Sequence, residues 1–349
     1  MPFTPPDFLM SPEASLGFRP CSEAGINYND SCDPTAERCL RRDISHHPRQ
    51  RILDLVYSDN SFVPRKFWNV IQKMRQMLTV EDGKDTLLVS GCSSNHFTET
   101  QAQIKNLHTN IFPAMPNIKY VLYDLGLTPE ERRDLEMYGN ATVLDFPFNE
   151  VPGFFKNLRC FSWKVFVIAA HLQQAEVLIW GDSSARFKGT ARLKELIDRT
   201  KTRGVQQKCS VGQVPTPLHT DPTMFEMWGD SPCAHRPYRM CQGNFGVYHN
   251  EPFVHRAIMT PWLACAAKED CMCKDNALDS NVQECRWPKH VNNSMWIGTC
   301  HRFDQSMISI ILAKLFREKY YHFAVNTDVA EVTLRDNGIE YFAELKGKS

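Results

Sequence analysis

Short apolar runs alternate with helix-like segments along the first half of this 349-residue chain. The runs have the length of buried strands, and the segments between them repeat apolar residues every three or four positions. Strands that alternate with helices pair in parallel and place a ligand site at their carboxyl ends. This predicts an α/β fold with a mostly parallel sheet flanked by helices. The expected strands cover 86–90, 118–124, 143–146 and 176–180, and the expected helices cover 64–78, 99–110, 158–174 and a segment that opens at Thr128.

The second half of the chain, from about residue 205 to 301, has a different composition. It is rich in proline, glycine, tryptophan and cysteine, and helical periodicity returns at 304–318. The chain has thirteen cysteines, but this half lacks the paired C-x2-C knuckles of a zinc site. We therefore expect a loop-rich C-terminal half that is stapled by disulfides. Because thirteen is odd, at least one thiol is free or pairs between chains, and we expect Cys92 and Cys160 to be simple buried apolar residues.

Charge and cysteine content limit where the chain works. Forty basic residues balance forty acidic residues, so no overall field favours nucleic acid or an anionic membrane. The cysteines, together with N-x-S/T sequons at Asn29, Asn140 and Asn292, favour a glycoprotein of the secretory pathway, in the Golgi or ER lumen. The sequence has no apolar run that could span a bilayer. We therefore expect a membrane anchor upstream of this sequence, and a cytosolic protein is the alternative.

The first 60 residues are expected to form an irregular stem. Prolines recur through this segment, and no apolar periodicity is sustained along it. Residues 61–349 are then expected to form a single domain.

Small polar residues follow the first two expected strands. Ser93 and Asn95 come after the first strand, where such side chains let a base or ribose approach the backbone; an ordinary helix-capping loop is the alternative. Asp124 ends the second strand and could accept a hydrogen bond from a base or ribose, or could be a turn residue. The first loop lacks the G-x-G-x-x-G pattern, which disfavours a nucleotide-dependent oxidoreductase.

The sharpest signal is the segment 180–187, which begins at the end of the fourth expected strand. Asp182 falls at the carboxyl end of that strand, where one carboxylate could help to hold a divalent cation that bridges two phosphates. Ser184 stands where a second carboxylate would complete such a site, so the site is poor in charge. Arg186 could instead offset phosphate charge directly. The alternative is a structural ion pair between Asp182 and Arg186.

Two further segments carry charged candidates. Lys164, with Arg159 nearby, lies in the helix before the fourth strand and could reach a pyrophosphate; a solvated helix face is the alternative. His301 and Asp304 precede an apolar helix and could face a sugar or an acceptor hydroxyl. The alternative for Asp304 is a helix cap.

The motifs at 94–97, 123–127, 163–164, 179–187 and 301–306, in this order, resemble those of an uncharacterised family of animal glycosyltransferase-like proteins. That family is similar to the nucleotide-diphospho-sugar transferases of the GT-A type, whose Rossmann-related sheet is flanked by helices. The resemblance covers roughly residues 85–320. It implies that the domain at 61–349 is catalytic.

The resemblance implies a lumenal type II membrane protein that transfers a sugar from a UDP- or GDP-sugar to a hydroxyl group of a glycan or glycoprotein, with manganese (Mn²⁺) as cofactor. Ser184, in place of a second aspartate, is the departure from the pattern. A catalytically inactive lectin-like or adhesive module on the same fold is the alternative. With the candidates above, Asp182 becomes the metal ligand, Asp304 and His301 the catalytic residues, and the nucleotide-sugar-binding residues are Ser93, Asn95, Asp124, Lys164 and Arg186.

Overall fold

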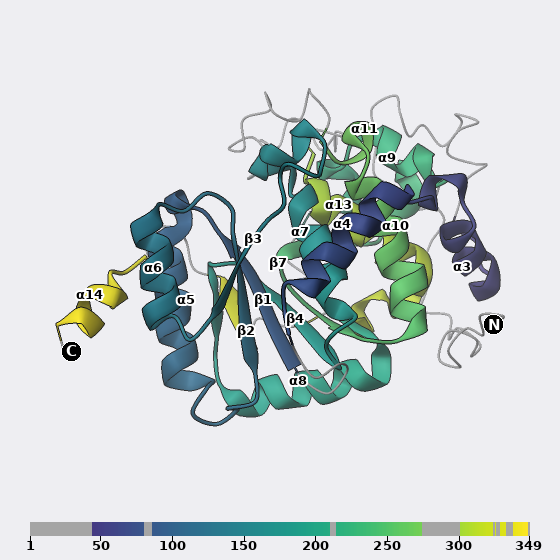
Figure 1. The fold of residues 1–349 in the computed structure, drawn as a ribbon. Coiled ribbons are helices and arrows are strands. Elements are labelled where there is room, and N and C mark those ends of the chain that lie inside the picture. Colours follow the sequence, from purple (N-terminus) through teal and green to yellow (C-terminus); the bar gives the residue numbers. More distant parts are fainter. Residues whose placement is uncertain are drawn as a thin grey trace, which may run out of the picture.

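A six-stranded sheet lies at the centre of the computed structural model, which describes residues 44–79, 86–209, 214–273, 301–323, 325, 329–332 and 338–347 (Figure 1). Its strand order is β3-β2-β1-β4-β7-β6. The strands β1 to β4 pair in parallel, whereas β7 runs antiparallel to both β4 and β6. The strands are β1 (Thr86–Cys92), β2 (Lys119–Asp124), β3 (Thr142–Asp145), β4 (Val177–Gly181), β6 (Val205–Cys209) and β7 (Cys241–His249).

The predicted mostly parallel sheet flanked by helices is confirmed, and all four predicted strands are present. The apolar pattern does not predict β7, because Gly243, Asn244 and Gly246 interrupt its apolar residues. A separate two-stranded sheet pairs β5 (Ala185–Phe187) with β8 (Ala330–Val332).

Side chains along β1 and β4 alternate between the two faces of the sheet. Leu87 and Val89 of β1 belong to one hydrophobic core, and Leu88 belongs to the other. Leu178 and Ile179 of β4 divide in the same way. Because successive strand side chains point to opposite faces, strands that are apolar at every position must be covered on both sides.

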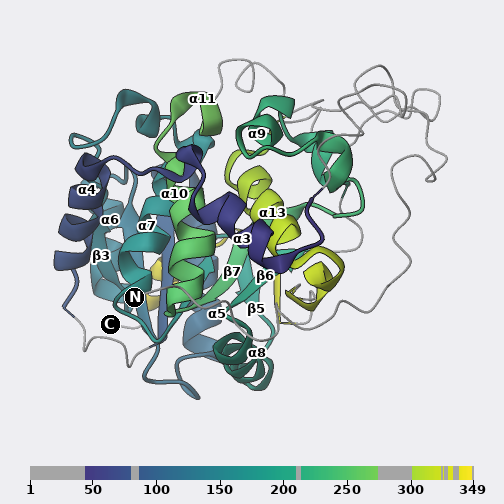
Figure 2. The same ribbon diagram turned by 90° about the vertical axis from the view of Figure 1, so that its right-hand side faces the viewer.

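Helices cover both faces of the sheet (Figures 1 and 2). The innermost helix is α7, in which every residue is buried and which contacts the sheet as well as α4, α10 and α13. A charged side chain on α7 therefore lies inside the protein and needs a partner there. One face carries α5 (Phe97–Asn110), α6 (Pro129–Tyr138) and α8 (Thr190–Arg203), and the other carries α4 (Arg65–Gln76), α7 (Ser162–Leu172), α10 (Thr260–Ala266) and α13 (Phe303–Phe316).

The helix predicted at 158–174 begins later than expected. Leu158–Cys160 forms a 3-10 turn, and Phe161 adopts a φ angle of 55° before α7 begins at Ser162. A left-handed residue cannot lie inside a right-handed helix, so the helix has to start after it. This turn carries Arg159 and Phe161 to the edge of the cavity described below.

The predicted irregular stem ends before residue 60. The helix α3 (Pro48–Val56) packs against α13, with Ile52 and Leu55 buried. Arg51 is also buried and donates to the carbonyl oxygen of Leu315 at 3.3 Å. A nine-residue helix is too short to give a clear apolar period in sequence. The rest of the predicted stem, residues 1–43, lies outside the described residues.

Disulfides connect the loop-rich half, as predicted, and one disulfide also joins this half to the α/β half. Cys92 is buried and free, as expected. The expectation that Cys160 is a simple buried thiol is wrong, because it forms a disulfide across the two halves. The described pairs are Cys160–Cys273, Cys209–Cys241 and Cys265–Cys271.

Within the described ranges, no helix is long and apolar enough to cross a membrane. Asn140 is exposed at the turn after α6, where a glycan could be attached. The other two sequons, at Asn29 and Asn292, lie outside the described residues.

Candidate functional site

The carboxyl ends of β1 and β4 meet at a topological switch point. The strand β1 pairs with β2 on one side and with β4 on the other, so the strand order reverses there. Open α/β sheets bind ligands in the crevice at such a point. A cavity of about 370 Å³ lies between the loop that follows β1 and the loop that follows β4.

The cavity combines an apolar wall with a polar one. A small-molecule site typically has this composition, with apolar surface for contact area and a few polar groups for orientation. Arg159 and Lys164 supply positive charge. The apolar wall consists of Leu125, Leu158, Phe161 and Trp163, and the polar wall consists of Ser93, Asn95, His96, Glu99, Asp182, Ser183 and Ser184.

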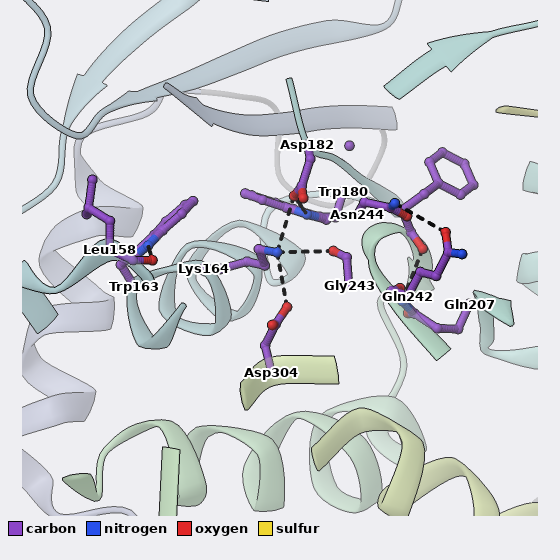
Figure 3. A network of polar contacts seen from close by, with 12 residues as sticks. Leu158, Trp163, Lys164, Trp180, Asp182, Gln207, Gln242, Gly243, Asn244 and Asp304 are labelled. Atoms are coloured by element: carbon purple, nitrogen blue, oxygen red, sulfur yellow. Dashed lines mark hydrogen bonds and ion pairs between the residues drawn. The ribbon is translucent and has the colours of Figure 1, made fainter. Parts of the chain in front are cut away.

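Lys164 holds three oxygen atoms from three distant parts of the chain (Figure 3). Its ammonium lies 3.2 Å from Oδ1 of Asp182 and 3.0 Å from Oδ2 of Asp304. It also donates to the carbonyl oxygen of Gly243 at 3.2 Å. We call these four residues the Lys164 cluster. It joins α7, the end of β4, β7 and α13 behind the cavity.

The members of the Lys164 cluster differ in exposure. The side chains of Lys164 and Asp304 are 2% and 0% exposed, whereas that of Asp182 is 29% exposed. Burial lowers the pKa of the Lys164 ammonium, but the two carboxylates outweigh burial and hold this pKa above its ordinary value. Burial also raises the pKa of the Asp304 carboxyl; Lys164 opposes this rise and Asp182 adds to it. Lys164 is therefore charged at neutral pH, and Asp182 is the acidic member that a ligand can reach.

Asp182 is held from one side. Its Oδ1 accepts a hydrogen bond from Nε1 of Trp180 at 2.7 Å and also faces Lys164. No residue in the described part of the chain donates to its other oxygen, Oδ2. The carboxylate is thus fixed in orientation while one oxygen stays available to a ligand.

Two phenylalanines with left-handed backbones stand at the starts of the helices that carry Lys164 and Asp304. Phe161 has φ 55° and Phe303 has φ 47°, and their ring centroids lie 5.9 Å apart. The Lys164 ammonium lies 4.6 Å from the centre of the Phe161 ring and 5.4 Å from that of Trp180. Cation–π attraction therefore adds to the stability of the buried charge.

Two glycines make room for this arrangement. A Cβ atom on Gly243 would overlap Oδ2 of Asp304, and one on Gly91 would lie 2.7 Å from the ring of Trp163. A glycine inside a strand often marks such a close approach. This is a signal in the sequence that could have pointed to both positions.

The structure places Ser93 and Asn95 in the polar wall, where Oγ of Ser93 lies 2.5 Å from Oδ1 of Asn95. The pair His96 and Glu99, which was not among the predicted site residues, lies beside them, with 2.6 Å between Nδ1 of His96 and Oε2 of Glu99. Their spacing of three residues, together with Glu99 in the first turn of α5, is the signal for this pair. The nucleotide-binding role of Ser93 and Asn95 stays a prediction.

Asp124 and Arg186 point to other partners. Oδ1 of Asp124 accepts from the backbone amides of Gly126 and Leu127, and its Oδ2 pairs with Arg132 at 3.0 Å. Arg186 donates to the carbonyl oxygens of Ser183, Ala185 and Glu99. The predicted ligand contacts of both residues would require these bonds to change, and both roles stay predictions.

His301 and Asp304 lie behind the cavity rather than on its walls. Nδ1 of His301 accepts from the backbone amide of Asp221 at 3.3 Å, and its ring contacts Phe303. Asp304 lies in the first turn of α13, whose N-cap position is occupied by Arg302. Its catalytic role stays a prediction. In this conformation the Asp304 carboxylate does not line the cavity but contacts Lys164, which does.

The predicted metal ligand Asp182 stands almost alone. Within the described residues, no three His, Cys, Asp or Glu side chains are placed to hold a metal ion together. Hard divalent cations take six or more oxygen ligands, and one oxygen of Asp182 is already bonded twice. A dication at the other oxygen would also stand close to the Lys164 ammonium, which would repel it. The residues present therefore fit a divalent cation poorly.

The sequence was compared with models of protein families and with curated protein sequences. A family of proteins of unknown function, DUF1647, matches residues 65–169. No curated protein sequence matches the chain.

Several solved structures are similar to this chain at low identity. The apo structure of WbbM, a bifunctional glycosyltransferase, has a TM-score of 0.39 and 12% identity over 69% of this chain and 39% of WbbM, so this chain spans well under two thirds of WbbM. The galactosyltransferase LgtC, in complex with donor and acceptor sugar analogues, has a TM-score of 0.37 and 12% identity over 75% of this chain and 95% of LgtC. Core-mannan synthase A (CmsA/Ktr4) from Aspergillus fumigatus, in an Mn/GDP form, has a TM-score of 0.37 and 10% identity over 68% of this chain and 72% of that chain.

Proposed function

We propose that this chain is a glycosyltransferase that moves a sugar from a UDP- or GDP-sugar to a hydroxyl group of a glycan or glycoprotein. The observation that carries the proposal is the cavity at the switch point, where an apolar wall faces the oriented carboxylate of Asp182. A nucleotide sugar has a flat base, a diphosphate and a sugar rich in hydroxyls. In the cavity, the apolar wall can contact the base, the cationic side chains can contact the diphosphate, and the polar wall can contact the sugar hydroxyls.

In this proposal the base and ribose lie against Trp163, within reach of Ser93 and Asn95. The diphosphate lies near Arg159 and the first turn of α7, because a guanidinium binds phosphate oxygens well and a helix N-terminus carries partial positive charge. The sugar hydroxyls then meet the free oxygen of Asp182. These placements agree with the positions of all five residues at the cavity.

Transfer also requires the loss of a proton from the acceptor hydroxyl. The buried carboxylate of Asp304 does not meet the cavity directly. We therefore propose that Asp304 is a positioning residue, which holds Lys164 and through it fixes Asp182. Asp182 is then the acidic member of the cluster that can contact a substrate hydroxyl.

We also propose that the protein works in the lumen of the secretory pathway, attached to the membrane by an N-terminal anchor. Three described disulfides favour an oxidising compartment. The exposed sequon at Asn140 is accessible for glycosylation.

Calorimetric titration of the disulfide-intact protein with UDP, GDP and their sugars, with and without Mn²⁺, tests the proposed function. We expect saturable binding of one nucleotide family, and its loss in the variant Asp182→Asn. Hydrolysis or transfer of the bound donor then identifies the sugar. A folded protein that binds free oligosaccharides but no nucleotide would favour the lectin-like alternative.

A further inference from the structure

Three oxygen atoms converge on the Lys164 ammonium in the way that oxygen ligands converge on a metal ion. Two are carboxylate oxygens, from Asp182 and Asp304, and one is the carbonyl oxygen of Gly243. All three lie between 3.0 and 3.2 Å from the nitrogen. Carboxylate and carbonyl oxygens are the ligands that hard divalent cations prefer.

We propose that Lys164 is an internal cation: it fills the oxygen cluster that would otherwise attract a divalent metal, so the site binds its donor without one. The part of this inference that concerns the donor rests on the function proposed above. The part that concerns the oxygen cluster rests on the geometry of these four residues alone.

Each N–H donor of the Lys164 ammonium can be matched by an oxygen acceptor. Lysine has three N–H donors, and three oxygen acceptors surround it. The rings of Phe161 and Trp180 cover other sides of the charge. The cluster therefore has a complete set of partners for a cation of charge +1 and offers no vacancy for a second cation.

Removal of the ammonium would leave two carboxylates close together, and that of Asp304 is fully buried. Oδ1 of Asp304 is itself buried, and within the described residues it has no hydrogen-bond partner. Such a pair of carboxylates either binds a cation or takes up a proton. The charge of Lys164 thus prevents both outcomes in the wild-type protein.

The phosphate charge of a donor then has to be met by other groups. Arg159 lines the cavity, and no described carboxylate pairs with its guanidinium. The first turn of α7, which carries Trp163 and Lys164 to the cavity, adds the positive end of an eleven-residue helix. These groups face the same cavity as Asp182.

Calorimetry with Mn²⁺ alone tests the oxygen cluster. We expect no saturable Mn²⁺ binding by the wild-type protein, and binding of one Mn²⁺ by Lys164→Met with an accompanying rise in melting temperature. The matched control Lys164→Met/Asp304→Asn keeps the methionine but removes one carboxylate, and it should lose the Mn²⁺ response. Mn²⁺ binding by the wild-type protein that Asp182→Asn abolishes would overturn the proposal, as would absence of any Mn²⁺ response in folded Lys164→Met.

A second measurement needs only the wild-type protein, so it decides the case if Lys164→Met does not fold. The affinity for the nucleotide sugar should change by less than about threefold between EDTA and excess Mn²⁺. Binding that requires Mn²⁺ would contradict the internal-cation proposal while it supports the transferase. If no nucleotide binds in either buffer, the proposed function fails, and the Mn²⁺ titrations still decide the role of Lys164.

Discussion

Two lysine–aspartate clusters are buried among the described residues, and one difference between them separates a ligand site from a structural ion pair. In the Lys164 cluster, Asp182 is 29% exposed and lines a cavity. In the second cluster, Lys314 on α13 pairs with Asp230 at 2.6 Å, and Asp230 also lies 2.9 Å from His235. All three of these side chains are at most 4% exposed.

The charges of the two clusters also differ. Burial raises the pKa of the Asp230 carboxyl, but His235 and Lys314 outweigh burial and hold this pKa below its ordinary value. The pKa of Asp304 is raised instead, first by burial and further by Asp182, the second carboxylate at the same lysine. A closed and well-compensated ion pair contributes to the fold, whereas a cluster with a shared lysine and one exposed carboxylate can respond to a ligand. Exposure of one member of the cluster, rather than the presence of a buried lysine, therefore marks the site.

The largest expected effect comes from neutralising each lysine in turn. Lys164→Met and Lys314→Met should each destabilise the fold by about 3–5 kcal/mol, because each removes the lysine that compensates a buried carboxylate. Lys164→Met should also abolish nucleotide-sugar binding, while folded Lys314→Met should bind as well as wild type. Denaturant unfolding and calorimetry measure the two properties. Equal loss of binding in both variants would mean that the two clusters do not differ in function.

The next effect concerns Asp304. Asp304→Asn should cost about 1–3 kcal/mol of stability, because Asn cannot offset the buried charge of Lys164. Transfer should fall by roughly a hundredfold, since the orientation of Asp182 is lost. A positioning role predicts that kcat falls while the donor affinity of the folded variant changes little, and kinetics on folded protein separates these quantities. Full turnover in folded Asp304→Asn would remove this residue from the mechanism.

A methyl group can test the geometry without a change of charge. Gly243→Ala would place a Cβ atom against Oδ2 of Asp304, and we expect a loss of about 1–3 kcal/mol of stability and slower transfer, with little change in donor affinity. Gly153→Ala is the matched control, because no atom lies within 4 Å of its added Cβ. If the two alanine variants behave alike in thermal unfolding, the Lys164 cluster tolerates displacement of Asp304.

Most of the sheet could be predicted from sequence because its strands are buried on both faces and therefore read as continuous apolar runs. The position of Asp182 could be predicted for the same reason, because a carboxylate that follows such an apolar run lies at the edge of the sheet where ligands bind. The partners of Asp182 could not be predicted. Lys164 and Asp304 stand 140 residues apart, and local pattern does not show which distant side chains the packing of α7 against α13 brings together. The residue at which α7 begins could not be predicted either. Phenylalanine rarely adopts a left-handed backbone, so the sequence does not indicate the positive φ angle of Phe161 that ends the preceding turn.

The last expected effect concerns stability alone and comes from a buried histidine that carries no charge in the fold. His171 on α7 lies 2.7 Å from the hydroxyl of Tyr123, and burial lowers its pKa to about 4. As pH falls below about 6.5, the unfolded chain takes up a proton that folded His171 does not, so stability should fall by about 2 kcal/mol between pH 7 and pH 5 from this residue. His171→Gln should flatten the pH dependence of unfolding by this amount. An unchanged slope would show that His171 titrates normally in the fold.

Calorimetric titration of UDP- and GDP-sugars into three disulfide-intact proteins tests the central claim most directly: wild type, Asp182→Asn and Lys314→Met. The cavity at the switch point is the donor site if wild type and folded Lys314→Met bind one equivalent of the same nucleotide sugar with similar affinity, and if Asp182→Asn binds at least about tenfold more weakly. Absence of nucleotide binding by the folded wild-type protein, or equal binding by Asp182→Asn, would contradict this account.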